Sequence, residues 1–230
     1  MTKQIVSCIV FIAAFATLIC AQKAEKSNAK PNAEIQKMLR EVSAKRIEAD
    51  IRKLASFGTR NTNSEQDNPT RGIGAARDWI FAELNKISSE CGNCLTIEKQ
   101  AYTQPPTPNR RITQPTVITN VFATLKGATD PDRVYVVSGH YDSMCQNAAD
   151  GKCDAPGAND DASGTAAVIE MARVMSKRKF DATVVFMAVA GEEQGLLGAA
   201  YFAEQAKEKK MDIEAMFTND IIGGVTTFKN

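Results

Sequence analysis

The sequence predicts an α/β domain with a mixed, largely parallel central sheet and helices on both faces. Short apolar runs rich in Val, Phe and Met are typical of buried strands. The segments between them carry apolar residues at helical spacing. This alternation is the signature of strand–helix–strand units. Ligands bind beyond the carboxyl ends of the strands in such sheets, and several polar residues of this chain are expected there.

The chain begins with a segment typical of an export signal. Residues 1–21 combine Lys3, an apolar run and then small or polar residues, with cleavage expected near Cys20 or Ala21. The run is short for a membrane span, and an uncleaved anchor is the alternative. Lipid attachment to Cys20 is disfavoured because the preceding Ile19 is bulky. We therefore expect a soluble exported protein, periplasmic or extracellular, that leaves the membrane after signal cleavage.

Composition limits the partners of the mature chain. With 230 residues, 43% of them hydrophobic, the chain is long enough for one domain with a sizeable core. Lys3 is the one charged residue of the leader, so its removal leaves basic and acidic residues in balance. This balance argues against nucleic acid or an anionic membrane as the main partner.

The first part of the mature chain predicts helices. Residues 22–32 are polar and are expected to form a flexible lead-in to a domain over 33–230. From 33 to 57 apolar residues recur at threes and fours, which predicts one amphipathic helix or two with a break near Ser43. Gly58 ends this pattern, and the polar segment TRNTNSEQDNPTRG that follows is interpreted as a loop.

Helices and strands alternate along the rest of the chain. The expected elements are a helix at 73–87, strands at 95–102 and 117–125, a strand from Val134, a helix at 162–175, a strand at 183–190, a helix at 196–209 and a strand at 215–222. The segment KGATDPD predicts a hairpin turn, so the strands on either side of it should pair antiparallel. GGVTTFKN follows the last strand without a closing helix, and we expect a domain that is incomplete at its carboxyl end.

Four cysteines remain once the leader is removed. Cys91 and Cys94 form C-G-N-C, and Cys145 and Cys153 flank a polar loop. In an oxidising compartment they predict disulfides, with Cys91–Cys94 and Cys145–Cys153 the most local pairing. A four-cysteine zinc site is the alternative, weakened by the long gap within the second pair. A thioredoxin-like redox role for the first pair is weaker still, because it follows a helix and such motifs normally begin one.

His140, the only histidine of the chain, follows an apolar run in the segment SGHYDS. A single histidine after a strand is usually a polar residue with a satisfied hydrogen bond. Asp142 changes this interpretation. A carboxylate two residues away can orient an imidazole so that its other nitrogen binds a metal.

Two further segments place pairs of carboxylates after apolar runs or before a helix. Asp160 and Asp161 lie in GANDDASG, and Glu192 and Glu193 lie in AGEEQG. Each pair has a structural explanation when taken alone. Asp161 or Ser163 can cap the helix that follows, which leaves Asp160 free to face a site. The two glutamates can be acidic residues favoured at a helix start by the helix dipole.

Taken together, these carboxylates predict a cation site. Asp220, in TNDIIG, adds another carboxylate at the same expected edge of the sheet. Such a group would repel strongly in a partly buried cleft unless several members are protonated or a cation neutralises them. A donor set that mixes imidazole with carboxylates suits zinc, cobalt or manganese better than calcium or magnesium.

The segments SGHYDS, GANDDASG, AGEEQG and TNDIIG, in this order and spacing, resemble peptidase family M28, the zinc aminopeptidases. The resemblance covers the chain from about residue 33 to its end. It implies the zinc-exopeptidase fold, two zinc ions, and hydrolysis of amino-terminal peptide bonds of peptides or proteins by a metal-activated water. The roles that it implies are His140 and Asp220 as ligands of one zinc, Asp160 as the bridge, Glu193 as a ligand of the second zinc, Asp142 as the residue that orients His140, and Glu192 as the general acid/base.

The chain departs from the family pattern in one respect. Family members supply a second histidine ligand from a later loop, and no histidine follows His140. Either the sequence stops before that residue or the second metal position is impaired, and the chain as it stands is expected to be metal-deficient and inactive. A glutaminyl-cyclase-like acyltransferase with a single zinc and a non-catalytic member of the same fold are the alternatives. The doubled Asp160–Asp161 followed by Ala-Ser-Gly resembles the peptidases more closely.

Overall fold

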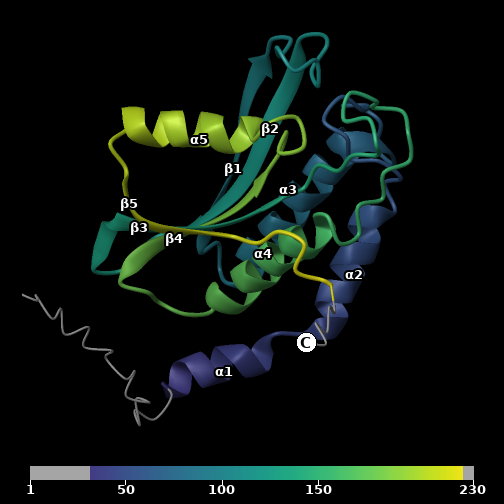
Figure 1. Ribbon diagram of the computed structural model, residues 1–230. Coiled ribbons are helices and arrows are strands. Elements are labelled where there is room, and N and C mark those ends of the chain that lie inside the picture. Colours follow the sequence, from purple (N-terminus) through teal and green to yellow (C-terminus); the bar gives the residue numbers. More distant parts are fainter. Residues whose placement is uncertain (1–31, 225–230) are drawn as a thin grey trace, which may run out of the picture.

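The computed structural model describes residues 32–224 (Figure 1). The predicted signal peptide, the lead-in up to residue 31 and the end of the chain from 225 lie outside the described residues. Within 32–224, no helix has both the length and the apolar character needed to cross a membrane.

Five helices and five strands form the described part of the chain. They are α1 (Ala33–Glu41), α2 (Ala44–Ala55), α3 (Gly72–Glu90), β1 (Leu95–Gln104), β2 (Thr116–Leu125), β3 (Asp130–His140), α4 (Ala162–Met175), β4 (Ala182–Val189), α5 (Leu197–Glu208) and β5 (Asp212–Thr218). The predicted break near Ser43 is confirmed, because the Ser43 hydroxyl caps α2 by accepting from the backbone N–H of Arg46.

The five strands form one mixed sheet in the order β1-β2-β4-β3-β5. β2 is antiparallel to β1 and β4, whereas β3 is parallel to β4 and β5. The predicted antiparallel pairing of β2 with β3 is wrong, because β4 lies between them. The segment joining β2 to β3 instead bonds to the residues that lead into β4, with Ala128 N–H donating to the Phe180 carbonyl and Asp130 N–H to the Asp181 carbonyl.

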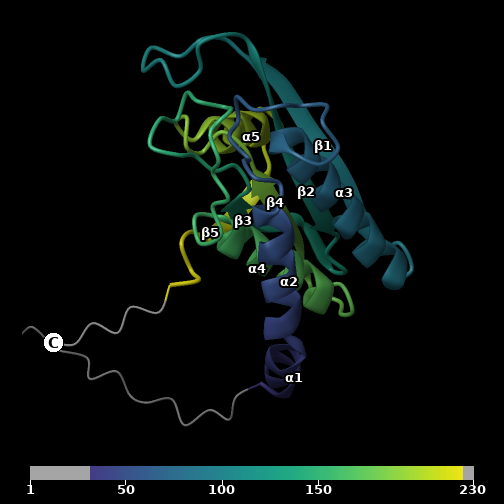
Figure 2. The ribbon, with the colours of Figure 1, turned by 90° about the vertical axis from the view of Figure 1, so that its right-hand side faces the viewer.

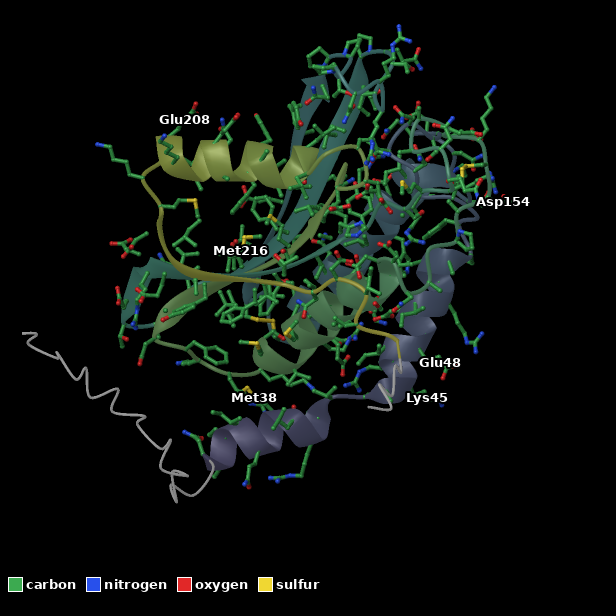
Figure 3. All side chains as sticks on the ribbon, in the orientation of Figure 1. Met38, Lys45, Glu48, Asp154, Glu208 and Met216 are labelled. Carbon is green, nitrogen blue, oxygen red and sulfur yellow. A yellow bond between two sulfur atoms is a disulfide. The ribbon has the colours of Figure 1, made fainter. Side chains whose placement is uncertain are left out.

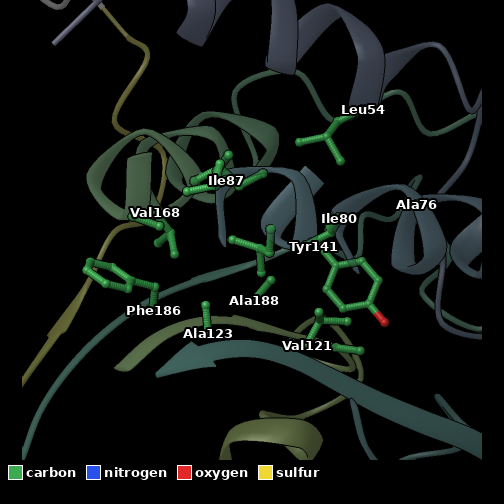
Figure 4. Close-up of a cluster of buried hydrophobic side chains, with 14 of the residues drawn as sticks. Leu54, Ala76, Ile80, Ile87, Val121, Ala123, Tyr141, Val168, Phe186 and Ala188 are labelled. Carbon is green, nitrogen blue, oxygen red and sulfur yellow. The ribbon is translucent and has the colours of Figure 1, made fainter. Parts of the chain in front are cut away.

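The central position of β4 follows from its composition. Its sequence ATVVFMAV is buried at every position, as expected for a strand covered on both faces. Alternate side chains face opposite layers. Val184, Phe186 and Ala188 pack in the core shared with α3 and α4 (Figure 4), whereas Val185 and Met187 pack toward α5.

Helices therefore cover both faces of the sheet. α5 lies on one face, and α2, α3 and α4 lie on the other (Figures 1 and 2). This confirms the predicted α/β architecture. The strand β5 forms one edge of the sheet in the described chain, and Met216, labelled in Figure 3, is 47% exposed there.

Both predicted disulfides are present. Cys91 bonds to Cys94 at the end of α3, and Cys145 bonds to Cys153 across the loop before α4. This excludes the four-cysteine zinc site, because all four sulfurs are used. It also means that Cys145, Asp150 and Cys153, which lie close enough to hold a metal, offer no free thiolate for one.

Candidate metal centre

The ends of three strands bring the predicted site residues to one edge of the sheet. His140 is the last residue of β3, Glu192 and Glu193 follow β4, and Asp220 follows β5. Asp160 lies in the loop that leads into α4. The strand at 215–222 was predicted too far along the chain, since β5 ends at Thr218. Asp220 therefore lies in the turn beyond the strand end, where ligands bind in sheets of this type.

His140 is the centre of the cluster and is only 3% exposed. Its Nε2 atom lies 3.1 Å from Asp160 Oδ1 and 3.7 Å from Asp220 Oδ1. Glu192 Oε2 lies 4.0 Å from the same nitrogen. Ligand atoms of His140, Asp160 and Asp220 lie within 4.8 Å of one another, which is close enough for them to share one ion.

Asp142 lies on the other side of the imidazole. Its Oδ1 atom is 3.4 Å from His140 Nδ1, and the side chain is fully buried. The same carboxylate accepts the backbone N–H groups of Glu192, at 3.2 Å, and Glu193, at 3.1 Å. One buried carboxylate thus orients the imidazole and fixes the backbone of the two glutamates, as outer-shell partners of metal ligands commonly do.

Asp161 has the capping role that was considered for it. Its Oδ1 atom accepts from Gly164 N–H at 2.8 Å, which caps α4. Its Oδ2 atom accepts from His140 N–H at 3.0 Å, and Thr165 Oγ1 donates to the His140 carbonyl at 2.9 Å. The start of α4 therefore holds the backbone of His140 on both sides, and Asp160, half exposed, faces the site.

Two glycines allow the elements around His140 to approach one another. A Cβ atom on Gly139 would lie 2.7 Å from the backbone carbon of Gly164, and a Cβ on Gly164 would lie 2.3 Å from the Asn219 carbonyl oxygen. Asn219 is held by two hydrogen bonds to the Ser138 carbonyl, one from its backbone N–H at 2.8 Å and one from its amide at 3.1 Å. These contacts place Asp220 beside His140.

The two glutamates do not belong to a helix start. α5 begins at Leu197 and has no acidic residue in its first turn, so the helix dipole does not explain them. They lie in a turn bounded by Gly191 and Gly195, whose φ values of +74° and +124° favour glycine. The turn directs Glu193 into a buried position and leaves Glu192 partly exposed.

Burial and mutual repulsion make the charges of this cluster costly. Burial raises the pKa of Asp161 to about 7 and, with Asp160 nearby, the pKa of Glu193 to about 7. Burial also raises the pKa of Glu192. For His140 burial acts against the charged form, but Asp142 and the other carboxylates raise its pKa to about 10. A divalent cation would replace these protons, because it neutralises several carboxylates at once.

Sequence reasoning missed the loop that supports this edge. Thr59, Arg60, Asn61 and Thr62 are each at most 1% exposed, although the segment was interpreted as a plain polar loop. The guanidinium of Arg60 donates to four backbone carbonyls, those of Leu54, Tyr141, Pro156 and Gly157. Nothing in a run of polar residues distinguishes a buried loop from an exposed one.

The donor set fits a zinc site. Zinc takes imidazole nitrogen and carboxylate oxygen, and a zinc-bound histidine commonly has a carboxylate against its second nitrogen. His140 has this arrangement, with Asp142 at Nδ1 and two carboxylates at Nε2.

The fold is of the zinc-exopeptidase type, and the site at its edge has the donor groups of a zinc centre. Two solved structures share the fold. The aminopeptidase from Aneurinibacillus sp. strain AM-1 has a TM-score of 0.62 and 17% identity, over 84% of this chain and 73% of that one. A glutaminyl cyclase from Porphyromonas gingivalis has a TM-score of 0.62 and 18% identity, over 80% of this chain and 62% of that one. At such identities the likeness establishes the fold alone.

The family follows from closer matches. Residues 120–227 match the model of peptidase family M28. A probable zinc metalloprotease of Leptosphaeria maculans is 50% identical over 196 residues, which cover 85% of this chain and 45% of that protein. The matched part of the chain therefore belongs to peptidase family M28, as its motifs predicted. The chain spans less than half the length of this relative.

Proposed function

We propose that this chain carries the metal site of a zinc-dependent exopeptidase that removes amino-terminal residues from peptides or proteins. The observation that carries the proposal is the position of His140, with Asp160 and Asp220 against Nε2 and Asp142 against Nδ1. The name of the Leptosphaeria relative supports zinc and proteolysis, and the Aneurinibacillus aminopeptidase supports the exopeptidase type.

The residues present can hold most of a two-zinc site. His140 and Asp220 would bind one ion, Asp160 would bridge, and Glu193 would bind the second. Bound zinc would lower the pKa of water and polarise the carbonyl of the scissile bond. The second histidine ligand that the family pattern implies is not among these residues.

Glu192 is suited to move the proton. Its carboxylate is 32% exposed and lies 4.0 Å from His140 Nε2, so it faces the same space as the ligands. It would accept a proton from water as the water oxygen attacks the carbonyl carbon. It would then donate that proton to the amine as the carbon–nitrogen bond breaks. Burial raises the pKa of Glu192, which makes its carboxylate a stronger base for this transfer.

The charge of the site favours an amino terminus over a carboxyl terminus. Bound zinc would neutralise the carboxylates that bind it, so the ammonium group of a free amino terminus would be attracted by a carboxylate of the site that does not bind the metal. We therefore expect cleavage of substrates with a free α-amino group and none of the same substrates after acetylation.

The variant Glu192→Gln tests the assignment of the proton carrier. It keeps the size of the side chain but removes the base, so kcat should fall by about 10²–10⁴-fold. Zinc content, measured by atomic absorption, should stay at the wild-type level. A Glu192→Gln enzyme with near-normal turnover of an aminoacyl anilide would exclude Glu192 as the base.

A peptide with amino-terminal Gln separates the peptidase from the cyclase. Mass spectrometry of the products should show a shortened peptide and free Gln. Loss of ammonia without chain cleavage would instead identify an acyltransferase. Neither product, from a protein that also binds no zinc, would identify a non-catalytic member of the fold.

We also propose that the protein is exported. Support comes from the apolar stretch after Lys3 and from the disulfides Cys91–Cys94 and Cys145–Cys153, which persist in oxidising compartments. Amino-terminal sequencing of the secreted protein should find a mature chain that begins near Ala21. Recovery of the uncleaved chain from the cytosol would contradict export.

A further inference from the structure

The carbonyl of Ala148 accepts hydrogen bonds from three side-chain amides. Gln194 Nε2 donates to it at 3.0 Å, Asn61 Nδ2 at 3.1 Å and Asn63 Nδ2 at 3.3 Å. Ala148, Asn61 and Gln194 are all buried. A single carbonyl with three donors is unusual, since a backbone oxygen has two lone pairs. The position of this carbonyl therefore matters to two separate segments, the loop that contains Asn61 and Asn63 and the turn that contains Gln194.

Ala148 lies within the loop that the Cys145–Cys153 disulfide closes. This loop packs closely on the segment at 59–64, and the two lie side by side in Figures 1 and 2. A Cβ atom on Gly151 would lie 2.3 Å from the Asn63 carbonyl oxygen, so the contact leaves no space for a side chain. The disulfide and this contact together fix where the Ala148 carbonyl points.

Gln194 links that carbonyl to the metal site. It follows Glu193 directly and is fully buried. Its Nε2 donates to Ala148, whereas its Oε1 has no hydrogen-bond partner among residues 32–224. An unpaired buried oxygen is costly, so the hydrogen bond to Ala148 is the favourable polar contact of this side chain among residues 32–224.

The opposite side of the same turn is held by a different loop. Arg111 Nη1 donates to the Glu193 carbonyl at 2.6 Å, and Asn109 Nδ2 donates to the Gln194 carbonyl at 3.3 Å. The backbone N–H of Glu193 is held by Asp142. Hydrogen bonds therefore hold the turn at the N–H of Glu193, at the carbonyls of Glu193 and Gln194, and at the side chain of Gln194.

We propose that the disulfide-closed loop 145–153 is a positioning element of the metal site, which acts on the ligand Glu193 through the Ala148 carbonyl and the Gln194 amide. The inference rests on the proposed function, because it assigns Glu193 to a bound zinc. Gln194 itself touches neither metal nor substrate and is a positioning residue. Outer-shell partners of this kind typically change metal affinity by about 10–100-fold when removed.

The second disulfide provides a matched control. Cys91–Cys94 also closes a short segment, and Cys94 lies beside the end of α4, with its sulfur 3.3 Å from the Ser176 carbonyl. No hydrogen bond of the described residues joins this pair to the turn at Glu193. Removing it removes a cross-link without touching the support of the metal ligand.

The experiment uses the full chain in four forms: wild type, Cys145→Ser/Cys153→Ser, Cys91→Ser/Cys94→Ser and Gln194→Leu. Zinc affinity is measured by competition with a chromogenic chelator, and the visible absorption of the cobalt-loaded protein reports the geometry of the ligands. We expect about 10-fold weaker zinc binding and an altered cobalt spectrum for Cys145→Ser/Cys153→Ser and for Gln194→Leu. The Cys91→Ser/Cys94→Ser protein should match the wild type in both.

Each other outcome has a distinct meaning. Wild-type affinity and spectrum in Cys145→Ser/Cys153→Ser and in Gln194→Leu would overturn the inference and leave the proposed function standing. Equal losses in both disulfide variants would overturn it as well, since the effect would then be general. A wild-type protein that binds neither metal would refute the proposed function itself. If Cys145→Ser/Cys153→Ser does not fold, Gln194→Leu alone decides.

Discussion

At the scale of single residues, Asp142 does more than its place beside His140 suggests. It is fully buried, faces His140 Nδ1 and accepts the N–H groups of both Glu192 and Glu193. The carboxylate therefore couples a histidine ligand at the end of β3 to a glutamate ligand after β4. These hydrogen bonds offset the cost of burying the carboxylate.

The variant Asp142→Asn tests this coupling. The amide keeps one oxygen acceptor but replaces the other oxygen by an NH2 donor, so either the imidazole of His140 or the backbone N–H of Glu193 loses its acceptor. We expect zinc affinity to fall by about 10–100-fold. Competition with a chelator measures it, and Asp181→Asn at the opposite end of β4 is the control. An unchanged affinity would show that Asp142 does not orient the ligands.

At the scale of elements, the site depends on how closely α4 packs against its neighbours. Gly164 lies in the first turn of α4, and a Cβ there would be 2.3 Å from the Asn219 carbonyl. Alanine favours a helix over glycine by about 1 kcal/mol. Helix propensity therefore predicts that Gly164→Ala stabilises α4, whereas tertiary packing predicts that it disrupts the contact with Asn219. The contact is so short that packing should outweigh propensity.

We predict that Gly164→Ala weakens zinc binding by at least about 10-fold, because Asn219 and with it Asp220 must move away from His140. Gly224→Ala is the matched control, since its Cβ would meet only one atom, at 3.7 Å. Isothermal titration with zinc measures both variants. Tight binding by Gly164→Ala would mean that the segment before Asp220 adjusts freely.

A buried ion-pair network joins α4 to α2. Glu170 is 1% exposed and accepts from Arg46 Nε at 2.9 Å, from Ser43 N–H at 2.8 Å and from Arg173 Nη1 at 2.7 Å. Burial opposes its charge, but these hydrogen bonds hold the pKa of Glu170 below its usual value of 4.5. The charged form is therefore the one that stabilises the fold.

The sign of the pH dependence follows from this lowered pKa. The Glu170 contribution is fully present above the unfolded-state pKa and is lost as the pH falls through the lower folded-state pKa. Glu170→Gln should cost about 2 kcal/mol of unfolding free energy at pH 7, because Arg46 loses its carboxylate partner and Arg173 keeps only Asp50 and Glu83. Thermal unfolding from pH 7 to pH 3 should narrow the difference in stability between wild type and variant. A constant difference across that range would contradict the assignment.

The elements themselves were largely predictable from local pattern, whereas their pairing was not. The helix at 162–175 was predicted with its observed bounds, because Asp161 caps it and apolar residues fill its inner face. The pairing of β2 with β3 failed, because a local turn signal cannot reveal that β4, far along the chain, lies between them.

Some residues of the site were also predictable from the sequence, whereas the contacts that support them were not. Motif residues such as His140 and Glu193 could be predicted, because each follows a strand whose end was recognisable. The support from Asn61 and Gln194 could not, because it depends on their contacts with Ala148, which lies 87 and 46 residues away along the chain. Both residues look like ordinary surface residues in the sequence, yet both are fully buried.

At the scale of the whole molecule, metal and fold should be linked. The site brings carboxylates from three strand ends and one loop together at one edge of the sheet. These carboxylates lie together in the folded state alone, so a bound cation would relieve their repulsion only there. Zinc at 100 times its dissociation constant should add about 2.7 kcal/mol to the free energy of unfolding. Thermal unfolding with and without a chelator measures this. Identical midpoints would contradict the linkage.

The most direct test of the metal site is the zinc content and activity, before and after chelation, of a form of the protein that includes the second histidine ligand implied by the family pattern. We predict that the purified protein contains zinc and releases amino-terminal residues from peptides. A chelator should remove the zinc and abolish this activity, and added zinc should restore both. A folded protein that takes up no zinc, or one that keeps its peptidase activity once the metal has been removed, would contradict the account.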